Sequence, residues 1–154
     1  ENVLTDWGKP VAYQTIHNAG WTSYAQTLAA KPETIVSAAD CLKLLVPIIQ
    51  QAQVDYVADP STTNALILDL VAQYNNGWMY DAGQADAAVA LALENGLIAN
   101  SPDGTLGSFD SQRMDEFLAL AIPIFEGLGE KLKPGLTSAD LATNQFIDPT
   151  IALP

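Results

Sequence analysis

The residue types that most often carry out chemistry are scarce in this chain, which has 1 His, His17, and 1 Cys, Cys41. A Ser-His-Asp or Cys-His arrangement needs a histidine beside its nucleophile, so any such site would have to use His17. Cys41 lies beside Leu42 in a segment with helical periodicity, where a buried structural thiol is the usual interpretation. The sequence therefore favours a structural Cys41, and a His17 at a strand end or in a cleft rather than in a catalytic pair.

Metal ligands are equally sparse. One His and one Cys cannot complete a zinc site of the usual ligand count. Residues 103–110 superficially suggest a calcium loop, but they lack the alternating acids, and Met114 stands where a bidentate Glu should be. A turn followed by a helix cap is the better interpretation, and no metal or cofactor is predicted. Paired carboxylates are best explained as solvated helix faces: Asp55 with Asp59, and Asp115 with Glu116.

Aromatic residues gather near the N-terminus: Trp7, Tyr13, Trp21 and Tyr24. Core packing is the plain explanation of such a group. A cleft wall that stacks on a flat or apolar ligand is the functional alternative, because an aromatic face offers a large contact area with specific geometry.

Composition sets the class of protein. The 154 residues include 49% hydrophobic and 16% charged side chains, and the net charge is −12. A chain of this length can form one domain with a sizeable core. Its six basic residues are scattered, which argues against nucleic-acid partners and anionic membranes. The longest apolar run, residues 44–49, is far shorter than the roughly 20 residues of a membrane span. One cysteine excludes an internal disulfide.

The elements that position these residues follow from periodicity. A short apolar run at residues 3–5 and β-branched or aromatic residues at 11–17 predict two strands. Six helices are then expected. Five of them span residues 21–28, 33–57, 61–74, 85–94 and 109–128. The sixth is short and begins at a capping box formed by Thr137 and Asp140. Pro47 is expected to kink the second of them. The apolar side of that helix is formed by Ile35, Ala38, Ala39, Leu42, Leu45, Val46 and Ile49. The predicted fold class is mainly α with a short β portion.

Several segments resemble the C-terminal part of a known protein family. They are residues 85–88, residues 95–98, Phe109-Asp110 before a long helix, and Asp140-Leu141-Ala142-Thr143-Asn144-Gln145-Phe146. Lys31-Pro32-Glu33 is similar to the family's step into a long helix. Together they resemble the C-terminal part of the periplasmic substrate-binding proteins of ABC importers, of the sulfonate/nitrate/taurine or NMT1/THI5-like type. The resemblance covers residues 3–147, about half of the family's usual length.

The resemblance implies a C-terminal fragment of a two-lobe α/β periplasmic-binding-protein (type II) fold. Residues 1–20 would be the end of the second lobe and the crossover strand, and residues 21–154 the helical covering layer of the first lobe. It also implies a periplasmic or extracellular, membrane-attached protein, whose signal and anchor we expect outside this sequence. Helices that cover an absent sheet would leave apolar faces open, so we expect self-association, as a two-fold dimer.

The function implied by the resemblance is capture of a small-molecule solute for an ABC transporter permease, without chemistry. Its expected ligand-binding residues are Trp7, Tyr13, Gln14 and His17, with aromatic stacking and hydrogen bonds from the latter two. An alternative is a helical protein-interaction module acting through an apolar dimerising face, in which a charge at Leu66 or Phe117 would abolish binding. A less favoured alternative is an enzyme like the thiamine-pyrimidine synthases of this family, which would use His17.

Overall fold

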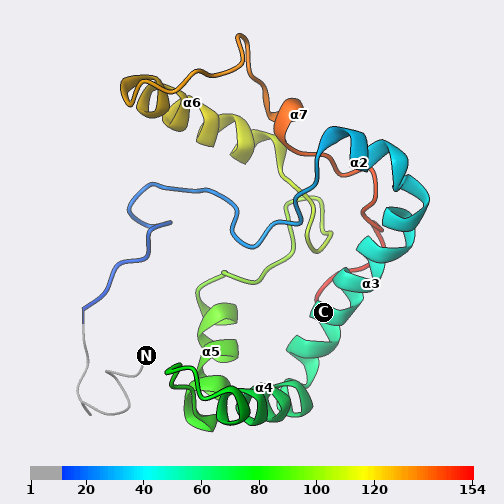
Figure 1. The fold of residues 1–154 in the computed structure, drawn as a ribbon, viewed down its shortest axis with the longest axis vertical. Coiled ribbons are helices and arrows are strands. Elements are labelled where there is room, and N and C mark those ends of the chain that lie inside the picture. Colours follow the sequence, from blue (N-terminus) through cyan, green and yellow to red (C-terminus); the bar gives the residue numbers. More distant parts are fainter. Residues whose placement is uncertain (1–11) are drawn as a thin grey trace.

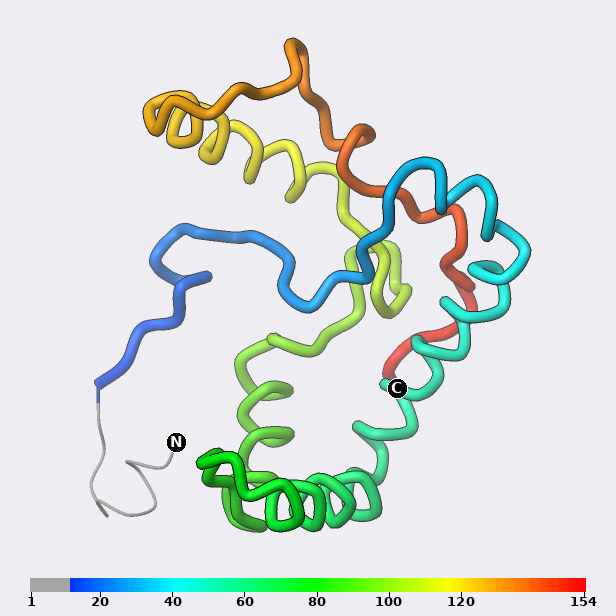
Figure 2. The backbone as a smooth tube through the Cα atoms, in the orientation of Figure 1, coloured from blue at the N-terminus to red at the C-terminus, as the bar shows by residue number. Residues whose placement is uncertain are grey.

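The computed structural model of the protein describes residues 12–154. Helices follow one another around an open curve, and the C-terminal segment runs back along one of them (Figures 1 and 2). The described helices are α2 (Pro32–Ser37), α3 (Ala39–Ala58), α4 (Ser61–Tyr74), α5 (Ala82–Glu94), α6 (Ser111–Gly127) and α7 (Ser138–Leu141).

The predicted two-lobe α/β fold is wrong, because residues 12–154 contain no sheet. Their β-pairing is an isolated bridge between Asn100 and Leu106. The strand expected at residues 11–17 does not form from residue 12 onward; Ile16 to Gly20 make a turn instead. The Thr15 hydroxyl accepts from the Asn18 amide at 3.0 Å, and the Gly20 amide donates to His17 at 2.9 Å. Residues 3–5 lie outside the described part of the chain.

The helix expected at residues 21–28 is also wrong, because this segment is non-helical and lies against α6. The Arg113 guanidinium donates to the carbonyls of Thr22 and Ser23, at 2.9 and 3.3 Å. Those contacts use backbone carbonyls that a helix would have bonded internally. Tertiary contacts therefore decide the conformation of this apolar segment against its periodicity.

The helix expected at residues 33–57 is divided at Ala38, which leaves α2 and α3. Helix α3 continues through Pro47 to Ala58. At its far end, the Tyr56 hydroxyl donates to Asn64 Oδ1 at 2.9 Å and ties α3 to α4. Asn64 is buried, and its Nδ2 finds no acceptor among the described residues.

The remaining helices follow their sequence signals closely. Helix α4 ends where Asn75 adopts a left-handed conformation with φ 41°. The Asp81 and Asp110 side chains cap α5 and α6 by accepting from the amides of Gln84 and Arg113, at 2.8 and 2.6 Å. The N-cap of α6 is thus Asp110, and the capping box of Thr137 and Asp140 begins α7 as expected.

The described core is small. Its buried apolar residues are Ala85, Val89, Leu106, Leu118 and Ala121. The chain exposes 11043 Å², whereas the surface scaling of folded monomers gives about 7,500 Å² for 16.4 kDa. Exposed large aliphatic side chains lie on α3, α4 and α6. Among residues 12–154, no helix is both long enough and apolar enough to cross a membrane.

Candidate functional site

The predicted ligand-binding residues do not form a site in the described part of the chain. Trp7 lies outside it. Tyr13, Gln14 and His17 are exposed, with 63% of Tyr13 accessible. Gln14 Nε2 donates to the Asn18 carbonyl at 3.3 Å within the turn. These residues line neither of the two hollows described below, so their role in binding a solute stays a prediction.

The other two aromatic residues of the N-terminal group have packing contacts. Trp21 meets Phe117 edge to face with ring centroids 4.8 Å apart, and Tyr24 meets Phe109 at 5.1 Å. The Arg113 guanidinium lies 4.1 Å from the centre of the Tyr24 ring, and the Tyr24 hydroxyl accepts from the Asp110 amide at 2.9 Å. Trp21 and Tyr24 therefore fix the non-helical segment 21–28 onto the start of α6.

Gln50 joins α3 to two distant segments. Its Nε2 donates to the Leu106 carbonyl at 2.8 Å and to the Asp148 carbonyl at 3.2 Å, and its Oε1 accepts from the Asp148 amide at 2.9 Å. The side chain is buried, with 4% exposed. The buried Gln50 carboxamide offers both a donor and an acceptor. It therefore satisfies backbone groups that a neighbouring β-strand would otherwise pair with.

Two asparagines make the same kind of pairing. Asn100 donates to the Leu153 carbonyl at 2.9 Å and accepts from the Leu153 amide at 2.8 Å. Asn144 does so with the carbonyl and amide of Phe109, at 2.9 and 2.8 Å. Together with Gln50 they hold the C-terminal segment where a sheet would otherwise satisfy its backbone. Asn144, which belongs to the segment 140–146 that resembles the importer family, thus has a structural role in this chain.

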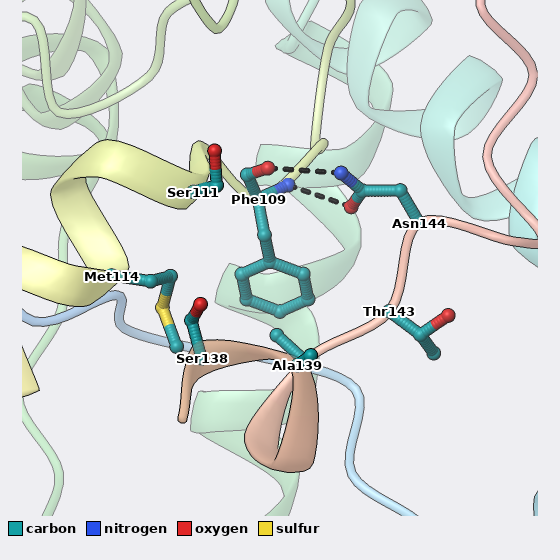
Figure 3. Close-up of a pocket in the computed structure, with 8 residues that line it drawn as sticks. Phe109, Ser111, Met114, Ser138, Ala139, Thr143 and Asn144 are labelled. Carbon is teal, nitrogen blue, oxygen red and sulfur yellow. Dashed lines mark hydrogen bonds between the residues drawn. The ribbon is translucent and has the colours of Figure 1, made fainter. Parts of the chain in front are cut away.

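A small pocket lies between α6 and α7 (Figure 3). The Phe109 ring points into it beside Met114 and Ala139, while the Phe109 backbone pairs with Asn144. Its volume is about 210 Å³, below the roughly 300–1,000 Å³ of typical ligand pockets. None of its lining residues is charged: Phe109, Ser111, Met114, Ser138, Ala139, Ala142, Thr143 and Asn144. A second hollow, of about 360 Å³, separates Lys43 and Pro47 from residues 145–149.

Asp140 is the strongest electrostatic feature near this pocket. Its carboxylate accepts from Lys133 Nζ at 2.5 Å and from the backbone amide and the hydroxyl of Thr137 at 3.0 and 3.1 Å. The bond from Lys133 is the largest cause, followed by the Thr137 bonds, and together they lower the pKa of Asp140 from 3.8 to about 2. The charged form of Asp140 therefore stabilises the start of α7.

This lowered pKa predicts an acid-sensitive contribution to stability. Because the folded pKa lies below the unfolded one, the contribution is full above pH 3.8 and is lost as the pH falls toward about 2. The variant Asp140→Asn should be less stable than wild type at pH 7 and should lose less on acidification to pH 2.5. Urea unfolding at both pH values measures this. Asp69→Asn, at an exposed acid of α4, is the control; an equal change in both variants would contradict the assignment.

An exposed apolar stripe lies on α3. Its aliphatic members are Leu44, Leu45, Ile48 and Ile49, with exposed fractions of 71%, 39%, 63% and 45%. Cys41 and Ala52, both exposed, extend it by one turn at each end. We call these six residues the α3 stripe. They recur at the spacing of one helix face, and the buried Gln50 lies on the opposite side.

The α3 stripe carries no charged residue. Asp40 and Lys43, paired at 3.3 Å, lie at its border, and Asp55 lies beyond its end. The expectation of a buried Cys41 was wrong, because the thiol is exposed within the stripe. Residues 12–154 also contain no cluster of three or more potential metal ligands. The chemistry that the stripe supports is therefore apolar contact.

Comparisons with known proteins do not identify the chain: no family model, curated protein or solved structure matches it.

Proposed function

We propose that this chain is a helical interaction module whose α3 stripe binds an uncharged aliphatic surface of a protein. One observation carries the proposal: four large aliphatic side chains lie 39–71% exposed along one face of a single helix. At about 25 cal/mol for each Å² of apolar surface removed from water, covering such a face supplies several kcal/mol. Soluble monomers rarely leave a contiguous apolar patch of this kind open.

The two residues of the alternative hypothesis have different roles within this proposal. Leu66 on α4 is 57% exposed and is therefore accessible to a partner. Phe117 contacts Trp21 edge to face at 4.8 Å. A charge at Phe117 would therefore disturb internal packing and would not report on partner binding.

A photo-reactive amino acid at position 48 tests the proposal in the cells from which the sequence comes. We expect one discrete cross-linked product from position 48 and none from position 128, another exposed aliphatic site at the end of α6. The product should disappear when Ile49→Glu is added, because a charge disrupts the apolar contact. A smear of products, or equal yields from positions 48 and 128, would contradict a specific interface.

Solute capture for an ABC importer stays a second hypothesis, and it is supported by the resemblance of residues 140–146 to that family. Its direct test is a thermal-shift screen of sulfonates, nitrate, bicarbonate and thiamine-type pyrimidines on the purified chain. A rise in melting temperature that His17→Ala or Gln14→Ala removes would support it. No shift with any solute would count against it.

A further inference from the structure

We infer that the surface bound by the α3 stripe is the same stripe of a second copy, packed antiparallel about a two-fold axis. The inference rests on the proposed interaction role and names its partner. It follows from the pattern of the stripe, from its lack of charge and from the area that the chain leaves exposed.

The stripe is its own antiparallel complement. Its positions are 41, 44, 45, 48, 49 and 52, and this spacing is the same in either direction along the helix. An axis midway between residues 46 and 47 places small Cys41 opposite small Ala52. The same axis places Leu44 opposite Ile49 and Leu45 opposite Ile48. Each apolar position therefore meets an apolar position of matching size, as an isologous interface requires.

Charge restricts a second copy to an uncharged surface such as the stripe. Two copies with a net charge of −12 each repel one another overall, so any contact between them must lie where charges are absent. The stripe provides such a region. Higher ionic strength should therefore strengthen the pairing by screening the repulsion, whereas it would weaken the binding of a basic partner.

The exposed area of the whole chain is compatible with a dimer. The chain exposes 11043 Å², about 3,500 Å² more than the scaling for a folded monomer of its size gives. Permanent homodimers bury about 2,000–5,000 Å² in total, half of it from each copy. The excess over the whole chain is larger than that half, and the α3 stripe is one of the exposed apolar faces that contribute to it.

Disulfide cross-linking of the purified full chain tests this geometry. In the antiparallel register, the variant Ala52→Cys places each new thiol opposite the native Cys41 of the other copy. Mild oxidation should then link most of the protein into covalent dimers. Gln53→Cys is the matched control, since this exposed neighbour projects from a different side of α3 and should give few dimers.

The wild-type chain distinguishes the possible orientations. Cys41 and its counterpart would lie about 16 Å apart along an antiparallel pair, beyond the reach of a disulfide. Wild type should therefore stay unlinked, and ready Cys41–Cys41 linkage would overturn the antiparallel register. Equal linkage of the Ala52→Cys and Gln53→Cys variants would overturn it as well. A chain that stays monomeric, yet gives the discrete product from position 48 in cells, would overturn the second copy but leave the interaction role intact.

Discussion

The variant Gln50→Leu should lower the free energy of unfolding by about 3 kcal/mol, because three backbone groups lose their buried partner. They are the Leu106 carbonyl and the carbonyl and amide of Asp148. These hydrogen bonds join α3 both to the loop that contains Leu106 and to the C-terminal segment. Urea unfolding followed by circular dichroism measures the loss.

Amide hydrogen exchange gives this prediction a local readout. The Asp148 amide donates to Gln50 Oε1, so its exchange should accelerate strongly in Gln50→Leu. Gln53→Leu, at an exposed position of the same helix, is the control and should change stability by less than about 0.5 kcal/mol. Similar losses in the two variants would mean that the carboxamide does not hold the C-terminal segment.

The variant Ile48→Glu should weaken self-association by at least about 100-fold. A two-fold interface would bury two new carboxylates among aliphatic side chains, and each buried charge without a partner costs several kcal/mol. Glu forms helices well, and Ile48 is 63% exposed in one copy, so the helix content should be retained. Sedimentation velocity over a range of concentrations measures the dissociation constant.

Leu128→Glu is the matched control for this substitution, because Leu128 is 72% exposed at the end of α6. It adds the same charge away from the α3 stripe and should leave association nearly unchanged. Ile48→Ala should give a smaller loss and separates the effect of charge from the effect of lost contact. Equal weakening by Ile48→Glu and Leu128→Glu would show that added charge alone, and not the stripe, controls association.

Local signals in the sequence predict the helices well, since periodicity and caps act within one or two turns. Helix α4 and the capping box of α7 have the expected positions. Helix α6 begins at Ser111, two residues later than expected, because Asp110 supplies the cap. The strand expected at residues 11–17 does not form from residue 12 onward, because β-branched residues form strands only when a partner strand pairs with them.

The candidate site was predictable only in part. Leu45 and Ile49 belong both to the predicted apolar side of the long helix and to the observed α3 stripe. The sequence could not show which side of the helix stays exposed. The opposite side is covered because Gln50 bonds to Leu106 and Asp148, which lie 56 and 98 positions further along the chain. Gln50, which directly follows the apolar run of residues 44–49, is the one sequence signal that marks this junction.

The mass of the purified chain in solution tests the central claim most directly. Multi-angle light scattering across a range of concentrations should give twice the 16.4 kDa of one chain at high concentration. The mass should fall toward 16.4 kDa on dilution, and added salt should shift this transition to lower concentration. A mass of 16.4 kDa at every concentration and ionic strength would contradict pairing through the α3 stripe.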